Sequence, residues 1–284
     1  MRILLTGKNG QVGWELQRSL AQLGVIVACD HADLDLSIPD QICSRVTEVK
    51  PDAIVNAAAY TAVDRAESDR DLAAAINATA PGILAEAAKK LGILLVHYST
   101  DYVFDGTKKS PYTEEDLPNP VNVYGATKLA GEQAIRATGC RHLIFRTSWV
   151  YSTRGSNFLL TIVRLAKQRP EIRVVNDQHG APTWARDIAA ATARVLSGKG
   201  EHTGVYNMSA GGRTTWFDFA RAILDTAGVA TSLIAIPGSQ YPTAARRPAN
   251  SILSNDKLCR DYGFQLECWR DGLARCLAGA PSLT

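Results

Sequence analysis

The sequence has little excess charge, no long apolar run and no paired cysteines, and each absence excludes a class of protein. Acidic and basic residues are interspersed and leave a formal net charge of +3 over 284 residues, so no basic block is present to follow a phosphate backbone. Nucleic acid is therefore not an expected partner. The first apolar run, after Met1, is too short for a signal peptide or for a spanning helix, which needs about 20 apolar residues. We expect a cytoplasmic protein that has no membrane partner.

Six cysteines are scattered along the chain without a Cys-x-x-Cys pair, so neither a zinc site nor a disulfide framework is predicted. They are Cys29, Cys43, Cys140, Cys259, Cys268 and Cys276. We expect reduced thiols and no bound metal. No segment repeats at a fixed period and none is low in complexity, which argues against a solenoid and against a disordered tail. With 46% hydrophobic residues, the chain can bury a sizeable core.

Short apolar runs alternate with helical stretches through the first half of the chain. The runs cover residues 3–5, 24–29, 53–56, 94–98 and 142–146. They are rich in Val, Ile, Leu and Ala, as strands are when helices cover both faces of a parallel sheet. Helices are expected between them at 12–23 and 72–91. This pattern predicts an α/β protein with a Rossmann-type, doubly wound parallel sheet.

The pattern becomes less regular after about residue 150, where we expect a smaller C-terminal lobe that binds substrate. Helices are predicted at 157–168, 184–196, 215–227 and 269–277, and strands at 172–175 and 204–208. We expect a dinucleotide-binding domain at 1–150, to which 174–208 returns by extending the sheet. Residues 151–173 and 209–284 would then form the substrate-binding lobe.

Three glycines, Gly7, Gly10 and Gly13, follow the first predicted strand at intervals of three and lead into a helix. This context permits a tight turn, a close approach of the backbone to a pyrophosphate and a helix N-terminus directed at the phosphates. The loop, which includes Gln11 and Val12, is therefore predicted to bind a dinucleotide. A plain turn is the weaker alternative.

Asp30 closes the second predicted strand, at a distance from the glycines that suits a carboxylate gripping a ribose hydroxyl pair. This favours NADH, although a solvated strand end would look the same. Lys8 lies in the glycine loop, where a cation can accept the 2′-phosphate of NADPH. The sequence therefore predicts NADPH or NADH as the cofactor without choosing between them.

The tripeptide Ser99-Thr100-Asp101 closes the fourth predicted strand. Tyr124 and Lys128 lie four residues apart near the start of a predicted helix, so their side chains share one face. Reduction of a ketone needs a group that protonates the carbonyl oxygen while hydride reaches the carbon. A phenol, whose pKa is ordinarily about 10, does this more readily when a neighbouring ammonium lowers that pKa. Tyr124 and Lys128 are therefore predicted to be catalytic, although a lone pair with this spacing is often only an amphipathic surface pair.

The glycine spacing resembles the extended branch of the short-chain dehydrogenase family, and segments along nearly the whole chain resemble the dTDP-4-dehydrorhamnose reductase family within that branch. These segments are 7–16, 55–63, 97–104, 122–132, 143–151 and 176–183. The resemblance implies an NAD(P)H-dependent reductase that converts the C4 ketone of dTDP-4-dehydrorhamnose to dTDP-L-rhamnose. Such an enzyme supplies a nucleotide sugar for cell-surface polysaccharides.

The same resemblance implies which residues bind the sugar nucleotide. Thr100 would hold and polarise the carbonyl, which makes it the third catalytic residue. Thr100 and Asp101 would contact the sugar, and Trp149 would stack or pack against it, although an ordinary core aromatic is the alternative for Trp149. Arg247, rather than Arg246, would pair with the diphosphate through its guanidinium.

Further cofactor contacts are also implied by resemblance. Small residues end the third predicted strand, and the family lays the flat cofactor against this segment, here at Ala59, Tyr60 and Thr61. A tightly packed strand end explains the small residues equally well. Asp35 and Leu36 stand where the family contacts the adenine.

Two positions bear on how the site is supported and how the protein assembles. Asn77 resembles the asparagine that supports the family's site from a helix, and an asparagine bonded to a nearby carbonyl is the alternative. Arg186 stands just after a Gly-Ala-Pro-Thr run, where some family members place a glutamate that joins a magnesium site between subunits. A cation does not ligate magnesium. A homodimer is therefore possible, but the sequence speaks against one linked by a metal.

Two other functions are compatible with this fold. A non-catalytic regulatory subunit, like the partner of methionine adenosyltransferase, keeps much of the pattern, but the intact Thr100, Tyr124 and Lys128 favour an enzyme. A different sugar-nucleotide epimerase or dehydratase is the second alternative. The dipeptide Asp101-Tyr102 lacks the Asp-Glu pair expected of a dehydratase.

Overall fold

Six parallel strands form the central sheet in the order β10-β5-β4-β3-β1-β2, in the computed structural model that describes residues 1–198 and 202–280. The strands are β1 (Arg2–Thr6), β2 (Val25–Cys29), β3 (Ala53–Asn56), β4 (Leu94–Thr100), β5 (His142–Thr147) and β10 (Gly204–Asn207). Each lies within about two residues of a range predicted from the sequence. The predicted doubly wound Rossmann-type fold is confirmed.

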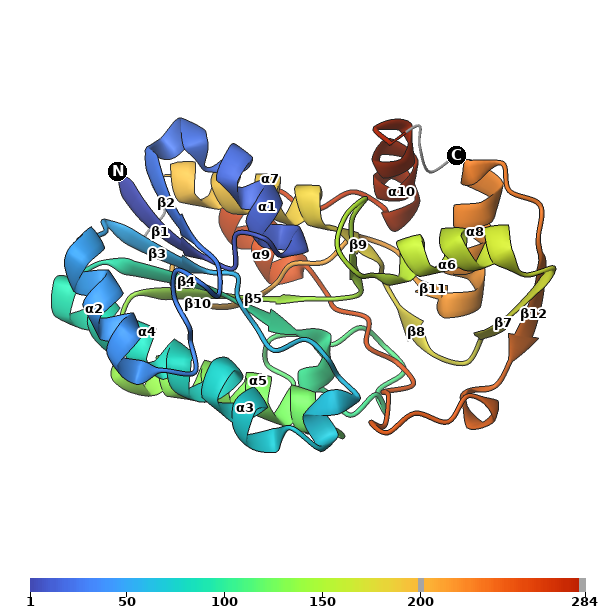
Figure 1. Ribbon diagram of the computed structural model, residues 1–284, viewed down its shortest axis with the longest axis horizontal. Coiled ribbons are helices and arrows are strands. Elements are labelled where there is room, and N and C mark those ends of the chain that lie inside the picture. The colour runs from blue at the N-terminus through green and yellow to red at the C-terminus, as the bar shows by residue number, and fades with distance from the viewer. Residues whose placement is uncertain (199–201, 281–284) are drawn as a thin grey trace.

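Helices cover both faces of this sheet (Figure 1). One face carries α1 (Gln11–Ser19), α7 (Ala185–Ser197) and α9 (Asp256–Tyr262), and the other carries α2 (Pro39–Val49), α4 (Ala80–Leu91) and α5 (Val123–Thr138). Neighbouring residues of a strand point to opposite layers. Ile3 and Leu5 lie in the core beneath α1 and α7, whereas Leu4 lies in the core beneath α2 and α4. Both faces are therefore buried, which is why the strands read as continuous apolar runs.

The long helix predicted at 72–91 is present, but it contains a π-helical turn. α3 (Arg70–Ala74) is followed by the π-helical turn η3 (Ala75–Thr79) before α4 begins. The wider turn buries Asn77 completely, at 0% exposure. The helices α2 and α9 were not predicted. In residues 1–198 and 202–280, no helix combines the length and the apolar content needed to cross a membrane.

A second body lies beside the sheet, at the right of Figure 1. Its helices are α6 (Phe158–Gln168), α8 (Trp216–Ala227) and α10 (Trp269–Ala278), as predicted to within about one residue. Its short strands pair as β7 (Glu171–Val175) with β12 (Ser232–Ile236), β8 (His179–Gly180) with β11 (Thr214–Thr215), and β6 (Val150–Tyr151) with β9 (Thr183–Trp184). Its core combines aliphatic side chains with aromatic ones such as Tyr151, Phe219 and Trp269.

The chain passes between the two bodies more than once. Within the range 174–208, α7 and β10 lie with the central sheet, whereas Val174 and Val175 belong to β7 and pair with β12 in the second body. Helix α9 comes from the C-terminal part of the chain and packs against β10. Partners so distant in sequence decide these placements, and local patterns do not reveal them.

Gly131, in the middle of α5, allows this helix to lie against η3. A Cβ atom on Gly131 would lie 2.1 Å from the backbone oxygen of Asn77. We expect Gly131→Ala to lower the free energy of unfolding in urea by about 2 kcal/mol or more, because the two helices must separate. In the control Gly279→Ala, the added methyl would meet nothing closer than 3.6 Å, so the change should stay below about 0.5 kcal/mol. Wild-type stability in Gly131→Ala would contradict this packing.

Candidate active site

The glycine loop between β1 and α1 is packed so tightly that two of its glycines leave no room for a side chain. Gly7 has a φ of +75°, and a Cβ atom there would lie 2.8 Å from the backbone nitrogen of Ala58. A Cβ atom on Gly13 would lie 2.0 Å from the backbone oxygen of Gly7. The loop therefore presents bare backbone and the N-terminus of α1 above the sheet, and such a cradle suits a pyrophosphate.

A crevice of about 770 Å³ opens beside this loop at the carboxyl ends of the strands. The predicted cofactor residues that line it are Gly7, Gly10, Gln11, Val12, Asp30, Asp35, Leu36, Ala59, Thr61, Tyr124 and Lys128. Gly13 lies beneath the loop, and the hydroxyl of Tyr60 donates to Asp69 at 2.7 Å, so neither is part of the lining. Asn77 accepts from the backbone nitrogen of Tyr60 at 2.9 Å and donates to its oxygen at 3.1 Å. Asn77 thus supports the wall of the crevice from behind.

Charged side chains gather where β2 ends. Lys8 forms an ion pair with Asp33 and lies 3.4 Å from Asp30, whose carboxylate also accepts from Asn9 at 2.9 Å. The hydrogen bond to Asp33 raises the pKa of Lys8. A 2′-phosphate would therefore compete with two carboxylates for Lys8, whereas Asp30 faces the crevice, where ribose hydroxyls would lie.

Tyr124 lies in the first turn of α5, with its ring edge toward Tyr102. The helix begins at this point because the side chain of Asn122 accepts from the backbone nitrogen of Gly125 at 2.7 Å. Burial raises the pKa of Tyr124 to about 12, and the hydroxyl of Thr100 works against this rise through a hydrogen bond. At neutral pH Tyr124 is therefore protonated and can act as a proton donor.

Lys128 is buried one turn after Tyr124, at 1% exposure. Its Nζ donates to the backbone oxygen of Tyr98 at 2.6 Å and lies 3.1 Å from Nε2 of His97. Burial lowers the pKa of Lys128 to about 8. The expectation that Lys128 lowers the pKa of Tyr124 is not met in this geometry, because burial dominates at the phenol and the ammonium is directed at β4.

Thr100 and Asp101 lie where β4 ends, beside the short helix η4 (Asp101–Val103). The hydroxyl of Thr100 accepts from the backbone nitrogen of Tyr102 at 3.2 Å and donates to Asp101 at 3.1 Å. Ser148 donates to the other carboxylate oxygen of Asp101 at 3.1 Å. Asp101 is 2% exposed, and burial raises its pKa to about 6. This hydrogen-bonded cluster fixes the Thr100 hydroxyl beside Tyr124.

Trp149 is held in an unusual backbone conformation at the start of the second body. Its φ is +47°, in the left-handed region that is costly for an aromatic residue. Its indole stacks on Trp216 with ring centroids 3.5 Å apart and planes 6° apart. A Cβ atom on Gly180 would lie 2.4 Å from the indole, so Gly180 makes room for it. Trp149 is thus held against Trp216 and Gly180 and remains partly exposed.

Arg247 is bound to a carboxylate within the protein. Its guanidinium donates to both oxygens of Asp64, at 2.9 and 2.8 Å, which lowers the pKa of Asp64. Both residues line a second cavity, of about 300 Å³, whose apolar wall comes from the second body. That wall includes Phe158, Ile162, Leu165, Ile172, Val174 and Trp216. Arg246 contributes its backbone oxygen, which accepts from Asn122 at 2.8 Å.

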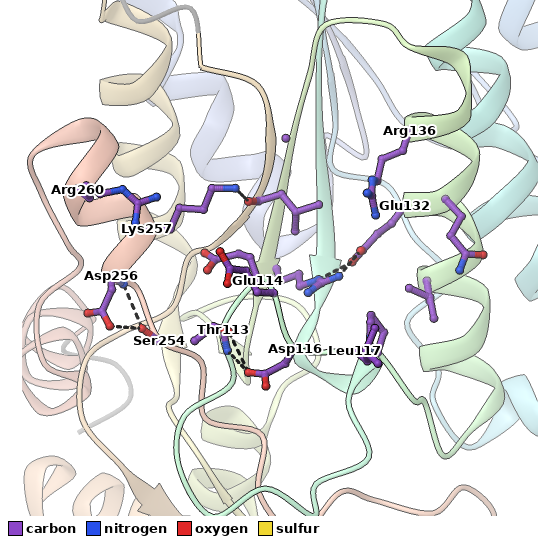
Figure 2. A pocket seen from close by; sticks show the side chains of 17 residues that line it. Thr113, Glu114, Asp116, Leu117, Glu132, Arg136, Ser254, Asp256, Lys257 and Arg260 are labelled. Carbon is purple, nitrogen blue, oxygen red and sulfur yellow. Dashed lines mark hydrogen bonds and ion pairs between the residues drawn. The ribbon is translucent and has the colours of Figure 1, made fainter.

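A third cavity, of about 640 Å³, lies between α5 and α9 (Figure 2). Glu132 reaches toward it from α5 and Lys257 from α9. At its wall, Arg146 of β5 donates to both carboxylate oxygens of Glu132, at 2.9 and 2.6 Å, and Ser99 of β4 donates to the same carboxylate. This buried ion pair ties α5 to two strands one turn beyond Lys128.

Sequence reasoning assigned no role to several buried polar residues near the site. Thr6 and Asn56 end β1 and β3, and His97 lies beside Asn56 in the middle of β4. Asp64 and Ser148 hold predicted site residues in place. The signal for the first three was a polar residue at the same height in each of three otherwise apolar strands. Nothing local identified Asp64 or Ser148, because their partners are distant in sequence.

Arg186, the position that departs from the family pattern, joins α7 to α1. Its guanidinium lies 3.3 Å from Glu15 and packs over the ring of Trp184. In the part of the chain that the structure describes, no group of three or more His, Cys, Asp or Glu residues is arranged to hold a metal ion.

The raised pKa of Asp101 has a consequence for stability. The folded protein holds this proton more tightly than the unfolded chain, whose carboxyl has a pKa near 3.8, so Asp101 lowers stability as pH rises from about 4 to about 6. The free energy of unfolding of Asp101→Asn in urea should therefore rise relative to that of the wild type, by about 2 kcal/mol, as the pH is raised from about 4.5 to about 7.5. In the control Asp105→Asn, which replaces a carboxyl with a pKa of about 2, the difference from the wild type should stay nearly constant. A constant difference for Asp101→Asn would contradict the raised pKa.

Known proteins resemble the chain along nearly its full length. A family model described as RmlD substrate binding domain matches residues 1–281. The dTDP-4-dehydrorhamnose reductase of Burkholderia thailandensis is 52% identical over 98% of both chains, and that of Salmonella typhimurium is 50% identical over 98% of this chain and 97% of its own. The crystal structure of dTDP-4-dehydrorhamnose reductase from Bacillus anthracis in complex with NADP is 38% identical, with a TM-score of 0.95 over 98% of this chain and 99% of that one. The chain therefore belongs to the dTDP-4-dehydrorhamnose reductase family, a family of NAD(P)H-dependent oxidoreductases.

Proposed function

We propose that the chain reduces the C4 ketone of dTDP-4-dehydrorhamnose to dTDP-L-rhamnose, with NADPH or NADH, and that Tyr124 donates the proton. One observation carries this proposal. Tyr124 and Lys128 line the same crevice as the glycine loop, and the hydroxyl of Thr100 lies within hydrogen-bonding reach of Tyr124. The substrate is proposed from the names of relatives at 52% and 50% identity.

The two bodies would each bind one of the two ligands. We assign the dinucleotide to the sheet body, broadly 1–150 with 174–208, and the sugar nucleotide to the second body, broadly 151–173 and 209–284. All the residues that line the crevice lie within 1–150, except Gly155 and Ser156. The second cavity is lined mainly by residues of the second body, so the two ligands would meet between the bodies.

The reaction would need two groups delivered to one carbonyl. A bound reduced nicotinamide supplies the hydride, which goes to the ketone carbon. Tyr124 would give its proton to the ketone oxygen, while Thr100 turns its one hydroxyl proton from Asp101 to that oxygen and polarises the carbonyl. The backbone nitrogen of Tyr102, which donates to the Thr100 hydroxyl oxygen, would keep that hydroxyl in place. Lys128, which lines the same crevice, would bind the nicotinamide end of the cofactor through its ammonium.

The diphosphate would lie near the second cavity. Arg247 offers a planar guanidinium, which suits bidentate binding of a phosphate, but Asp64 occupies it in the structure. Binding of the diphosphate would therefore exchange the carboxylate of Asp64 for phosphate oxygens. The stacked pair of Trp149 and Trp216 would form the apolar side of the sugar site.

Replacement of the proposed proton donor tests the assignment directly. Tyr124→Phe should lower turnover of dTDP-4-dehydrorhamnose by at least about 100-fold, because no group then protonates the ketone oxygen. Cofactor affinity, measured by nicotinamide fluorescence, should change by less than about 3-fold. Tyr206→Phe is the control, because it removes a hydroxyl that lies away from the crevice and donates to Asp261 at 3.0 Å. Turnover of this variant should stay within about 2-fold of the wild type. Undiminished turnover in Tyr124→Phe would remove Tyr124 from this role.

Asp30 is expected to set the preference between the two cofactors. Asp30→Ala should raise the ratio of kcat/KM for NADPH to kcat/KM for NADH by at least about 10-fold. The substitution removes the acceptor for ribose hydroxyls, and it leaves Lys8 with Asp33 alone, so a 2′-phosphate meets less negative charge. Initial rates with each cofactor give the ratio. Asp40→Ala, in the exposed first turn of α2, is the control and should leave this ratio unchanged. An unchanged ratio in Asp30→Ala would exclude a contact between Asp30 and the ribose.

A further inference from the structure

A row of buried polar side chains crosses three neighbouring strands and ends at Lys128. In the sheet register Thr6 of β1 pairs with Asn56 of β3, and Asn56 pairs with His97 of β4. The hydroxyl of Thr6 lies 2.6 Å from Oδ1 of Asn56, and Nδ2 of Asn56 lies 3.0 Å from Nδ1 of His97. The other ring nitrogen of His97, Nε2, lies 3.1 Å from Nζ of Lys128. The four side chains thus form one continuous hydrogen-bonded row.

The row is buried in the interior of the protein, where apolar side chains would pack at a lower cost in free energy. Asn56 of β3, His97 of β4 and Lys128 of α5 are each at most 1% exposed. Burial of such groups is costly unless each finds a partner. Lys128 has two, the backbone oxygen of Tyr98 and the ring of His97. Of these partners only His97 acts through its side chain, so it is the one that a substitution can remove.

The ring of His97 can form a hydrogen bond with Lys128 in either charge state of the lysine. Burial, with the nearby charge of Lys128, holds the pKa of His97 well below its ordinary range, so the ring is neutral and has one donor nitrogen and one acceptor nitrogen. When Asn56 turns its oxygen toward Nδ1, that nitrogen carries the proton and Nε2 accepts from an ammonium. When Asn56 turns its amide nitrogen toward Nδ1, Nε2 carries the proton and faces a neutral amine.

We propose that His97 is a positioning residue for the reductase reaction, which holds the Nζ of Lys128 at the crevice and stabilises its charged form by accepting a hydrogen bond. For this task Asn56 must present its amide oxygen to Nδ1 and its amide nitrogen to Thr6, which is the reverse of the amide orientation in the structure. The inference rests on the proposed function, because that function places the nicotinamide end of the cofactor beside Lys128. His97 itself lies beneath the crevice and touches neither ligand.

Other charged and titratable groups also surround Lys128. Tyr124 and Glu132 lie one turn before and one turn after it on α5, Asp101 follows β4, and Arg146 faces it from β5. The charge of Glu132 works against the lowering of the Lys128 pKa by burial. Arg146 already pairs with Glu132, and this limits what Glu132 contributes. The imidazole acceptor is therefore a separate support for the ammonium.

Two amide variants that differ by one methylene test the role. In His97→Gln the amide extends to the place of Nε2 and can accept from Lys128, whereas in His97→Asn it reaches only the place of Nδ1 and Asn56. NADPH affinity is measured by fluorescence from about pH 6.5 to about pH 10, because it should weaken as Lys128 loses its charge. We expect the midpoint of this weakening to move to lower pH by at least about one unit in His97→Asn, and by less than about 0.3 units in His97→Gln.

Thr192→Val provides the matched control. It removes a buried hydrogen bond of 2.7 Å to the hydroxyl of Tyr98, on the same strand as His97, and should lower thermal stability without moving the midpoint. An unmoved midpoint in His97→Asn, or an equal shift in Thr192→Val, would overturn the proposal. Should His97→Asn fail to fold, His97→Ser, which is also too short to reach Lys128, must show the same shift.

Turnover of dTDP-4-dehydrorhamnose, measured in the same series, separates this proposal from the proposed function. If the midpoint in His97→Asn moves as expected and the wild type reduces no ketone, the substrate assignment fails and the role of His97 stands. If the wild type reduces the ketone and the midpoint does not move, the role of His97 fails and the function stands.

Discussion

The buried ammonium of Lys128 is the constraint on which the arrangement of this site depends. A lysine at 1% exposure must find hydrogen-bond acceptors or give up its charge. Its acceptors, the oxygen of Tyr98 and the ring of His97, both belong to β4, so α5 must lie directly against that strand. Gly125 lets the start of α5 lie against η4, which follows β4, because a Cβ atom there would lie 2.1 Å from the oxygen of Tyr102. The phenol proposed as proton donor is thereby fixed at the crevice.

Different parts of the central sheet stabilise the fold and carry the polar groups of the site. The middles of the strands are apolar on both faces and pack beneath two layers of helices, whereas their carboxyl ends carry Thr6, Asn56 and Thr100. Because parallel strands end at one edge, these groups and the glycine loop meet in a single crevice. The ion pair of Asp64 with Arg247 then ties a loop of the sheet body to the C-terminal part of the chain. A buried core thus holds the polar residues at fixed positions.

The central sheet, the glycine loop and the placement of Tyr124 and Lys128 one turn apart on a helix could be predicted, because each depends on a short stretch of sequence. Helix α2 carried signals that were overlooked, with Pro39 in its first turn and apolar residues facing the core. The π-helical turn η3 and the pairing of β7 with β12 depend on packing between distant segments, as does the contact between Asp64 and Arg247, 183 residues apart. Periodicity does not record such contacts. The role proposed for His97 could not be predicted for the same reason, because it depends on a contact with Lys128 of α5.

The central claim is that this crevice transfers hydride and a proton to a sugar-nucleotide ketone. The most direct measurement supplies the purified protein with dTDP-4-dehydrorhamnose and a reduced nicotinamide cofactor, and follows cofactor absorbance together with the sugar product. The account predicts that cofactor is oxidised only when the keto sugar is present, with one dTDP-L-rhamnose formed for each cofactor consumed. Tight cofactor binding without any oxidation would contradict it and would favour a non-catalytic protein on the same fold.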